Sequence, residues 1–301
     1  MNRVINFMGV RKIALVLTLL VTAIALGSLA TKGLNFGLDF TGGTQIELAY
    51  EQPADLSSIR QHLAGAGYGD AVVQSFGATT EVVVRMQGDD ADLGNKVATV
   101  LQQAGDKLQV KKVEFVGPQV GEELRDQGGL GMLLALGGVM LYLAFRFQWK
   151  FSAGAFISLV HDVIVTLGIL SFFQITFDLT VLAALLAIIG YSLNDTIVVF
   201  DRVRENFRVL RKTSLIDNIN ISTTQTLLRT LATSISTLLA VGSLLVFGGD
   251  NLFGFAIALF VGVLVGTYSS IYISNAALVW LDLTVEDLIP PVATEEVDER
   301  P

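Results

Sequence analysis

The chain has 301 residues, of which 52% are hydrophobic and 16% charged, and its mean hydropathy is +0.60. A soluble protein of this length does not carry such a balance, so the composition indicates an integral membrane protein. The absence of cysteine excludes disulfides, cysteine-ligated metals and cysteine lipidation, while the net charge of −8 says little about partners because much of it lies in the C-terminal tail.

Six apolar stretches are long enough to cross a bilayer as helices. They are residues 13–30, 128–147, 151–175, 179–200, 227–247 and 252–281. The first also has the layout of a signal peptide, because Arg3, Arg11 and Lys12 precede an apolar run that ends in small residues. Its length favours an uncut helix, and both alternatives place the following region outside.

The basic residues fall on alternate sides of the predicted spans. They precede the first span, lie between the second and third, and follow the fourth, whereas the opposite short loops contain none. The basic residues before the first span are Arg3, Arg11 and Lys12, and those of the later groups are Arg146, Lys150, Arg202, Arg204, Arg208, Arg211 and Lys212. The positive-inside rule therefore predicts that both termini are cytoplasmic and that the long region after the first span lies outside.

The long outer region has the pattern of a small α/β domain. Residues 44–50, 71–76, 80–86 and 108–116 are predicted strands. Apolar residues at helical spacing predict one helix from Leu56 to Ala66, with Asp55 as its N-cap, and a second from Leu93 to Leu101. The order β-α-β-β-α-β is that of a ferredoxin-like unit, which by itself names no ligand.

The predicted fold is an α-helical membrane protein with six transmembrane helices and one extracytoplasmic ferredoxin-like α/β domain between helices 1 and 2. Four parts follow from these patterns. Residues 1–31 are the cytoplasmic N-terminus and first helix, 32–127 the outer domain, 128–281 the other five helices, and 282–301 an acidic cytoplasmic tail. Low apolar content predicts disorder in the tail.

The fourth predicted span contains a carboxylate, Asp195, beside an amide, Asn194. A helix that begins at Leu179 crosses about 30 Å of hydrocarbon near Phe200, which places Asp195 roughly 7 Å inside the membrane. An acid at such a depth costs about 2.5–3.5 kcal/mol, so a partner or a function is expected. If the fourth and fifth spans are antiparallel neighbours, Arg229 lies at a comparable depth and can pair with it.

Two interpretations of Asp195 and Arg229 are open. Low dielectric favours the neutral carboxylic acid and a nearby guanidinium favours the carboxylate, so a moving Arg would make the acid take up and release a proton. The alternative is a static ion pair that locks two helices together. We favour the proton relay.

A second set of polar residues follows the fifth span. Thr226, Thr230, Thr233 and Thr237 fall on one helix face and form a hydroxyl stripe, here called the Thr stripe. Such a stripe can carry a water-filled proton path. Hydroxyls that bond their own helix or a neighbouring one are an equally good explanation.

Three other titratable residues are secondary candidates. His161 and Asp162 lie inside the third span, where they either feed a relay or satisfy each other at a helix interface. Asp201 lies at the basic end of the fourth span and is a candidate gate for protons from the cytoplasm, although this end is chiefly a topology signal.

Five sequence motifs, in this order along the chain, match motifs of a known protein family. They are GLNFGLDFTGGTQIEL at 33–48, VGPQVGEELR at 116–125, HD at 161–162, GYSLNDTIVVFDRVRENF at 190–207 and TQTLLRTLATS at 224–234. With them the chain resembles the SecD/SecF family of bacterial protein-export membrane proteins, and one six-helix half with one compact outer domain matches the smaller of its members. The glycine motif comprises Gly37, Asp39, Phe40, Thr41, Gly42 and Gly43. It lacks the Lys of a phosphate-binding loop and is interpreted as a turn into a strand.

The resemblance implies a multi-pass protein of the bacterial inner membrane, with a periplasmic outer domain, that pairs with SecD as two halves of the resistance-nodulation-division type. It implies association with the SecYEG channel and use of the proton-motive force to assist translocation of preproteins. An accessory membrane subunit is a further candidate partner. By motif match the relay residues are Asp195 and Arg229. No cofactor, metal or nucleic acid is expected.

Two other classes of function are compatible with the sequence. One is half of a proton-driven exporter of small molecules or lipids, and the other is a non-transporting assembly factor of the Sec channel, in which Asp195 would tolerate replacement by Asn. An enzyme is the least supported class, because no constellation of nucleophile, base and orienting group accompanies His161 or His62.

Overall fold

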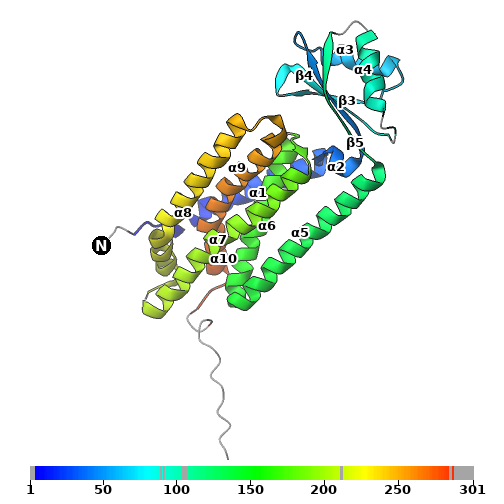
Figure 1. The fold of residues 1–301 in the computed structure, drawn as a ribbon. Coiled ribbons are helices and arrows are strands. Elements are labelled where there is room, and N and C mark those ends of the chain that lie inside the picture. Colours follow the sequence, from blue (N-terminus) through cyan, green and yellow to red (C-terminus); the bar gives the residue numbers. More distant parts are fainter. Residues whose placement is uncertain are drawn as a thin grey trace, which may run out of the picture.

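A bundle of long helices carries a small α/β domain at one end in the computed structural model, which describes residues 4–88, 90, 92–103, 107–210, 213–284 and 287 (Figure 1). Six helical segments among these residues have the length and composition to cross a membrane. They are α1 (Arg11–Lys32) with a short 3-10 turn before it, α5 (Pro118–Arg146), α6 (Trp149–Phe172), α7 (Leu179–Val209), α8 (Leu215–Phe247) and the pair α9 (Asp250–Ile271) and α10 (Ile273–Trp280). The predicted fold class is confirmed.

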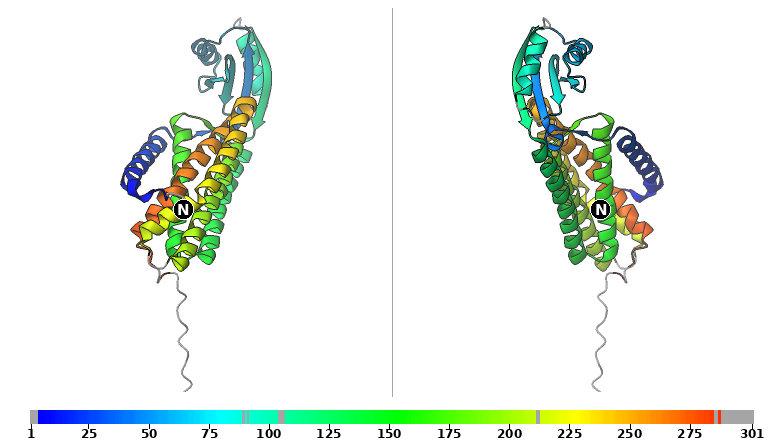
Figure 2. Two further views of the ribbon diagram at one scale, coloured as in Figure 1. Left: turned by 90° about the vertical axis from the view of Figure 1, so that its left-hand side faces the viewer. Right: turned by 90° about the vertical axis from the view of Figure 1, so that its right-hand side faces the viewer.

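Helix α7 is the central helix of the bundle. It packs against α5, α6, α8 and α9, and one of its faces is buried along its whole length. Helix α1 instead lies at the periphery on α6, with a smaller contact to α10 (Figure 2). The arrangement places Asp195 of α7 inside the bundle and leaves the N-terminal helix beside it.

The last span is broken at Tyr272, between α9 and α10. Buried polar side chains on both sides of the break bond to backbone carbonyls: Ser274 Oγ donates to Ser270 O, and Asn275 Nδ2 donates to Ser270 O and Ile271 O. Such side chains compete with the helical backbone bonds and bend helices. The sequence analysis had predicted one continuous span here.

Helix α5 begins at Pro118, directly after the last strand of the outer domain, whereas the apolar pattern begins only at Gly128. Proline suits the first helical position because its missing N–H would have no helical partner there. The second span therefore extends out of the apolar region as one rod that reaches the outer domain (Figure 1).

The outer domain is a four-stranded antiparallel sheet with two helices on one face. Its elements are β2 (Gly43–Tyr50), α3 (Leu56–Gly65), β3 (Val72–Phe76), β4 (Ala78–Met86), α4 (Leu93–Gln103) and β5 (Leu108–Val116). The strand order β3-β4-β2-β5 is the one that a ferredoxin-like β-α-β-β-α-β unit produces. Asp55 caps α3 as predicted, since its side chain accepts from the backbone N–H groups of Ser57 and Ser58.

A short parallel ladder joins the outer domain to the bundle. Strand β1 (Asn35–Phe36) follows α1, pairs with β6 (Thr176–Phe177) in the loop between α6 and α7, and leads into the one-turn helix α2 (Leu38–Thr41). These two-residue strands carry no periodicity that a sequence pattern can detect. Of the predicted features, Arg3, Arg211, Lys212 and most of the acidic tail lie outside the described residues.

Candidate functional site

Asp195 is a buried carboxylate in the middle of the bundle, with 3% of its surface exposed. Its Oδ2 atom has no hydrogen-bond partner among the described residues. A buried polar atom without a partner is rare in proteins and costs about 1–3 kcal/mol, so it marks a strained or functional position. The carboxylate is therefore placed as a titrating group would be.

Arg229 lies on the neighbouring helix α8 but does not form an ion pair with Asp195 among the described contacts. Its side chain is exposed on the outside of the bundle, and its influence on Asp195 is electrostatic. Asn194, the neighbour of Asp195, is exposed as well. The structure thus places the two predicted relay residues on adjacent helices without an ion pair between them. The exposed side chains of Arg229 and Asn194 must then be covered by lipid or by a partner.

The Thr stripe divides into two kinds of residue. Thr226 Oγ1 donates to Ser222 O at 3.0 Å and Thr233 Oγ1 donates to Thr230 O at 2.9 Å, so both hydroxyls bond their own helix. Thr230 is 1% exposed and its Oγ1 atom has no partner among the described residues, while Thr237 is half-buried. The hydroxyl of Thr230, one residue after Arg229, is the one left available near the relay.

Asp162 is held by donors from three helices. His161 Nδ1 lies 3.1 Å from Asp162 Oδ1, and Asp162 Oδ2 accepts from Ser192 Oγ on α7 at 2.5 Å and from Ser269 Oγ on α9 at 2.7 Å. The Asp162 side chain is fully buried. This cluster ties α6, α7 and α9 together one helical turn before Asp195. The two serines were missed by the sequence analysis because Ser occurs throughout apolar helices.

Asp201 pairs with Arg146 at the end of the bundle. Its two carboxylate oxygens lie 2.9 and 3.2 Å from Nη2 of Arg146, which is the last residue of α5. Both side chains are about two-fifths exposed, so the pair contributes little to stability. The structure places it as a link between the ends of α5 and α7.

The glycine motif forms the N-terminal anchor of α7. Gly37 N donates to Phe177 O at 2.8 Å, and Asp39 Oδ2 accepts from Leu179 N at 3.0 Å. Asp178 caps the same end through Val181 N. Carboxylates satisfy free N–H groups at a helix start and interact favourably with the helix dipole. The motif thus holds the beginning of the helix that carries Asp195.

The two adjacent glycines allow three backbone segments to meet. Gly42 and Gly43 have φ of +65° and +110°, and a Cβ atom on Gly43 would lie 2.2 Å from Met86 O. A Cβ on Gly42 would lie 2.8 Å from the Cα of Pro118, and one on Gly121 would lie 2.7 Å from Gly42 N. Only glycine fits this crossing of the motif with β4 and the start of α5. Phe40 stacks on Phe177 beside it, and Thr41 Oγ1 donates to Gly37 O.

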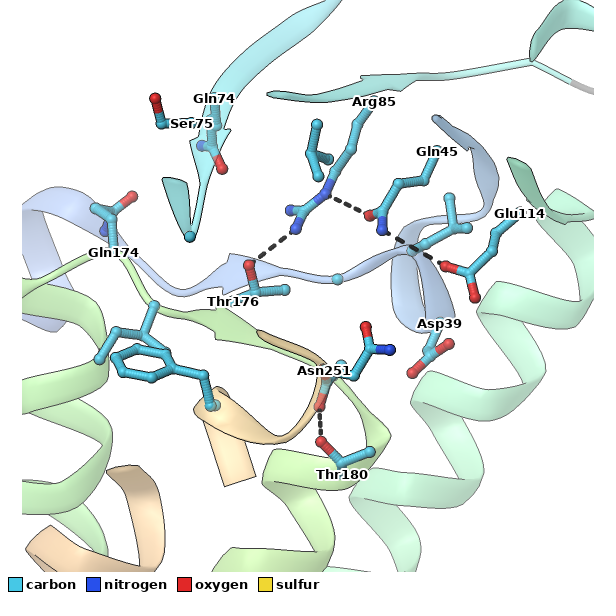
Figure 3. A pocket seen from close by; sticks show the side chains of 18 of the residues that line it. Asp39, Gln45, Gln74, Ser75, Arg85, Glu114, Gln174, Thr176, Thr180 and Asn251 are labelled. Carbon is cyan, nitrogen blue, oxygen red and sulfur yellow. Dashed lines mark hydrogen bonds between the residues drawn. The ribbon is translucent and has the colours of Figure 1, made fainter. Parts of the chain in front are cut away.

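A cavity of about 580 Å³ separates the open face of the sheet from the loops of the bundle (Figure 3). Arg85 of β4 spans its edge, with Nε donating to Gln45 Oε1 at 2.9 Å and Nη2 donating to Thr176 Oγ1 at 2.8 Å. Burial lowers the pKa of the Arg85 guanidinium, and the nearby Asp178 carboxylate opposes part of that shift. Arg85 is therefore a side-chain link from the outer domain to the loop before α7.

Comparison with known proteins identifies the family. A family model described as "Protein export membrane protein SecD/SecF, C-terminal" matches residues 96–284, and one described as "SecD/SecF GG Motif" matches residues 27–54. The second match covers the glycine motif that anchors α7.

Curated relatives match over nearly the whole chain. The "Protein translocase subunit SecF" of Pseudomonas aeruginosa is 71% identical over 299 residues, which is 99% of this chain and 98% of the relative. The protein of the same name from Vibrio alginolyticus is 48% identical over 308 residues, covering 100% of this chain and 98% of the relative.

Solved structures agree. The crystal structure of SecDF, a translocon-associated membrane protein from Thermus thermophilus, is 39% identical with a TM-score of 0.86 over 94% of this chain, and a SecDF structure in a super-membrane-facing form gives 0.70 over the same share. This chain spans 39% of each SecDF chain. It therefore belongs to the SecD/SecF family of protein-export membrane proteins, as one of its SecF subunits.

Proposed function

We propose that this chain assists protein export as the SecF half of a SecDF-type complex, using the proton-motive force. In this proposal it lies in the bacterial inner membrane with both termini cytoplasmic, pairs with SecD, and acts with the SecYEG channel on translocating preproteins. Its relatives carry the name of a translocase subunit, and the related SecDF is described as translocon-associated.

The single observation that carries the mechanism is the state of Asp195. Its carboxylate is buried, and among the residues that the structure describes one of its oxygens has no hydrogen bond and no ion pair joins it to its cationic neighbour Arg229. A static ion pair would show a close contact between the two groups. A carboxylate that is loosely held near a mobile cation can instead exchange a proton as the distance between them changes.

Helix α7 supplies the mechanical connection in this proposal. Asp195 lies about 24 Å along the helix axis from Leu179, whose N–H is held by Asp39 of the glycine motif. The outer domain is attached to the same end of α7 through β1, β6 and Arg85. Protonation of Asp195 alters the packing of α7 against α8, and a rigid helix transmits that change to the outer domain.

The test is replacement of Asp195 by Asn, which keeps the side-chain shape but cannot ionise. We expect full-length, membrane-inserted protein that has lost most of the stimulation of preprotein translocation by an imposed proton gradient in inverted membrane vesicles. Glu205→Gln, a change of an exposed carboxylate on the same helix, is the matched control and should retain the stimulation. An Asp195→Asn variant that responds to the gradient like the wild type would contradict the proton relay and favour a non-transporting assembly factor.

A further inference from the structure

A second cavity, remote from the relay, lies between α1 and α10. It has a volume of about 320 Å³, and its walls are nearly all apolar. Ala14 and Leu15 of α1, Ile157 of α6, and Ile273 and Ala276 of α10 line it. Helix α1, which forms one wall of the groove, lies at the periphery of the bundle and packs on α6 and α10 (Figure 2). In a membrane, such a groove faces the lipid acyl chains.

One end of the groove carries a positive charge. Arg11, the first residue of α1, lines the groove and is half-buried. Its Nη1 donates to Met8 O at 3.0 Å, and no carboxylate of the described residues lies within ion-pair distance of it. A guanidinium has five N–H donors in a planar fork, so most of its capacity to bind an anion is free. Partial burial of this charge without a counter-ion is unfavourable, and an anion at the groove's end would relieve it.

The rim of the groove carries a tryptophan, a residue type that is common at the membrane surface. Trp280, at the end of α10, lines the groove and is 79% exposed. Tryptophan is enriched at the level of the lipid headgroups. Arg11 and Trp280 therefore mark the headgroup level, and the apolar walls from Ala14 to Thr18 extend from there toward the membrane interior.

We infer that this groove binds one anionic phospholipid. An acyl chain lies along the apolar walls between α1 and α10, and the lipid phosphate accepts hydrogen bonds from Arg11. Basic pockets between transmembrane helices on the cytoplasmic side bind anionic headgroups in this way. The charge of Arg11 and the volume of about 320 Å³ favour this occupant over a further helix, because a helix with a diameter of about 10–12 Å would fill that volume in less than one turn.

The experiment uses the full-length chain in lipid nanodiscs that contain one part phosphatidylglycerol to four parts phosphatidylcholine with identical acyl chains. Lipids that stay bound on release from the nanodisc are counted by native mass spectrometry. We expect one retained lipid, with a ratio of phosphatidylglycerol to phosphatidylcholine about five times that of the nanodisc, which is the effect of one basic residue near an anionic surface. Arg11→Gln should remove the enrichment and keep a retained lipid. Lys12→Gln removes an equal charge from the adjacent, exposed residue that does not line the groove, and should keep the enrichment.

A third variant tests the apolar part of the site. Ala276→Leu narrows the groove and should lower retention of both lipids, with an unchanged midpoint of thermal unfolding as the check on folding. Retention of the two lipids by the wild type in the one-to-four ratio of the nanodisc would overturn the inference. An equal loss of enrichment in Lys12→Gln and Arg11→Gln would also overturn it, because it would assign the effect to diffuse surface charge. Unchanged retention in Ala276→Leu, or a copurifying membrane peptide that displaces both lipids, would overturn it too.

Discussion

Two buried aspartates in the same bundle have opposite surroundings. Asp162 accepts hydrogen bonds from two serine hydroxyls and contacts His161, whereas Asp195 has a carboxylate oxygen without a partner in the described part of the chain. A carboxylate whose lone pairs are satisfied is held in place and rigidifies its neighbours. A carboxylate with a free oxygen can accept a proton without first breaking a bond. We therefore propose different roles for the two residues, although both are acids in apolar spans.

This difference predicts opposite mutational phenotypes. Asp162→Ala leaves the Ser192 hydroxyl and the His161 ring without their buried partner and leaves Ser269 only its bond to Gly266 O, so we expect a loss of about 2–5 kcal/mol in the free energy of unfolding. The midpoint of thermal unfolding in detergent should fall well below that of the wild type, while Asp195→Asn should leave it unchanged. If Asp162→Asn kept full stability but lost the proton-driven stimulation of translocation, Asp162 would belong to the proton path.

The Thr stripe offers a matched pair of variants. Thr230 has a buried hydroxyl with no partner among the residues that the structure covers, whereas the Thr226 hydroxyl bonds its own helix. Valine has nearly the same shape, and removal of an unsatisfied hydroxyl costs little stability. We expect Thr230→Val to lower the stimulation of translocation by a proton gradient and Thr226→Val to preserve it. Equal activity of both variants would limit the stripe to helix packing.

At the scale of the elements, the glycine motif is the point where β4, α5 and α7 meet. Gly43 touches Met86, Gly42 touches Pro118, and Asp39 holds the start of α7. A short loop with no side chains in the way thus fixes the positions of three long elements. The glycines of this motif are therefore required by the close packing at this junction.

Gly43→Ala tests that requirement. The added Cβ would lie 2.2 Å from Met86 O at a φ of +110°, so both contact and backbone conformation oppose it. We expect a loss of more than about 2 kcal/mol in the free energy of unfolding, seen as a lower thermal midpoint and faster proteolysis of the outer domain. Gly69→Ala, which has open space around it in the same domain, should be within about 0.5 kcal/mol of the wild type. Equal stability of the two variants would contradict the packing account.

Elements with a long periodic pattern were predictable from the sequence, and those fixed by distant contacts were not. The six spans, the four strands of the outer domain and the Asp55 cap follow from local spacing. The β1 and β6 pairing joins two residues to two others that are more than a hundred positions away, and the break at Tyr272 depends on side chains that also fit a straight helix. Asp195 was predictable because an acid in an apolar span is costly. The exposed position of Arg229 was not, since it depends on which helix faces outward.

At the scale of the whole molecule, the outer domain has a core of its own. Its buried apolar residues form one cluster without members from the bundle, and they are Ile46, Leu48, Ile59, Leu63, Val73, Val82, Val84, Met86, Val97 and Leu101. The domain excised from Asn35 to Pro118 should therefore fold as a soluble monomer. A domain of about 80 residues has a small core, so we expect modest stability in a circular dichroism melt. An unstructured spectrum would mean that the bundle completes the core.

The polar outer surface of the bundle predicts where the partner binds. Asn194 and Arg229 are exposed on α7 and α8 at membrane depth, where a second helix bundle would cover them. Cysteine at Ser236, an exposed position on α8, should crosslink to SecD in membranes that contain both chains. Cysteine at Ile13, which is 72% exposed on the peripheral helix α1, is the control and should not. Crosslinks only between two copies of this chain would favour a symmetric exporter.

The chain enters the outer domain at Gly43, where β2 begins, and leaves it at Gly117, before α5, so both connections lie close to the bundle. These two connections, here called tethers, define an axis between the domain and the bundle. Rotation of the domain about the line that joins them stretches neither tether, whereas translation away from the membrane stretches both. Arg85 lines the cavity between the domain and the bundle, where its bond to Thr176 opposes such a rotation.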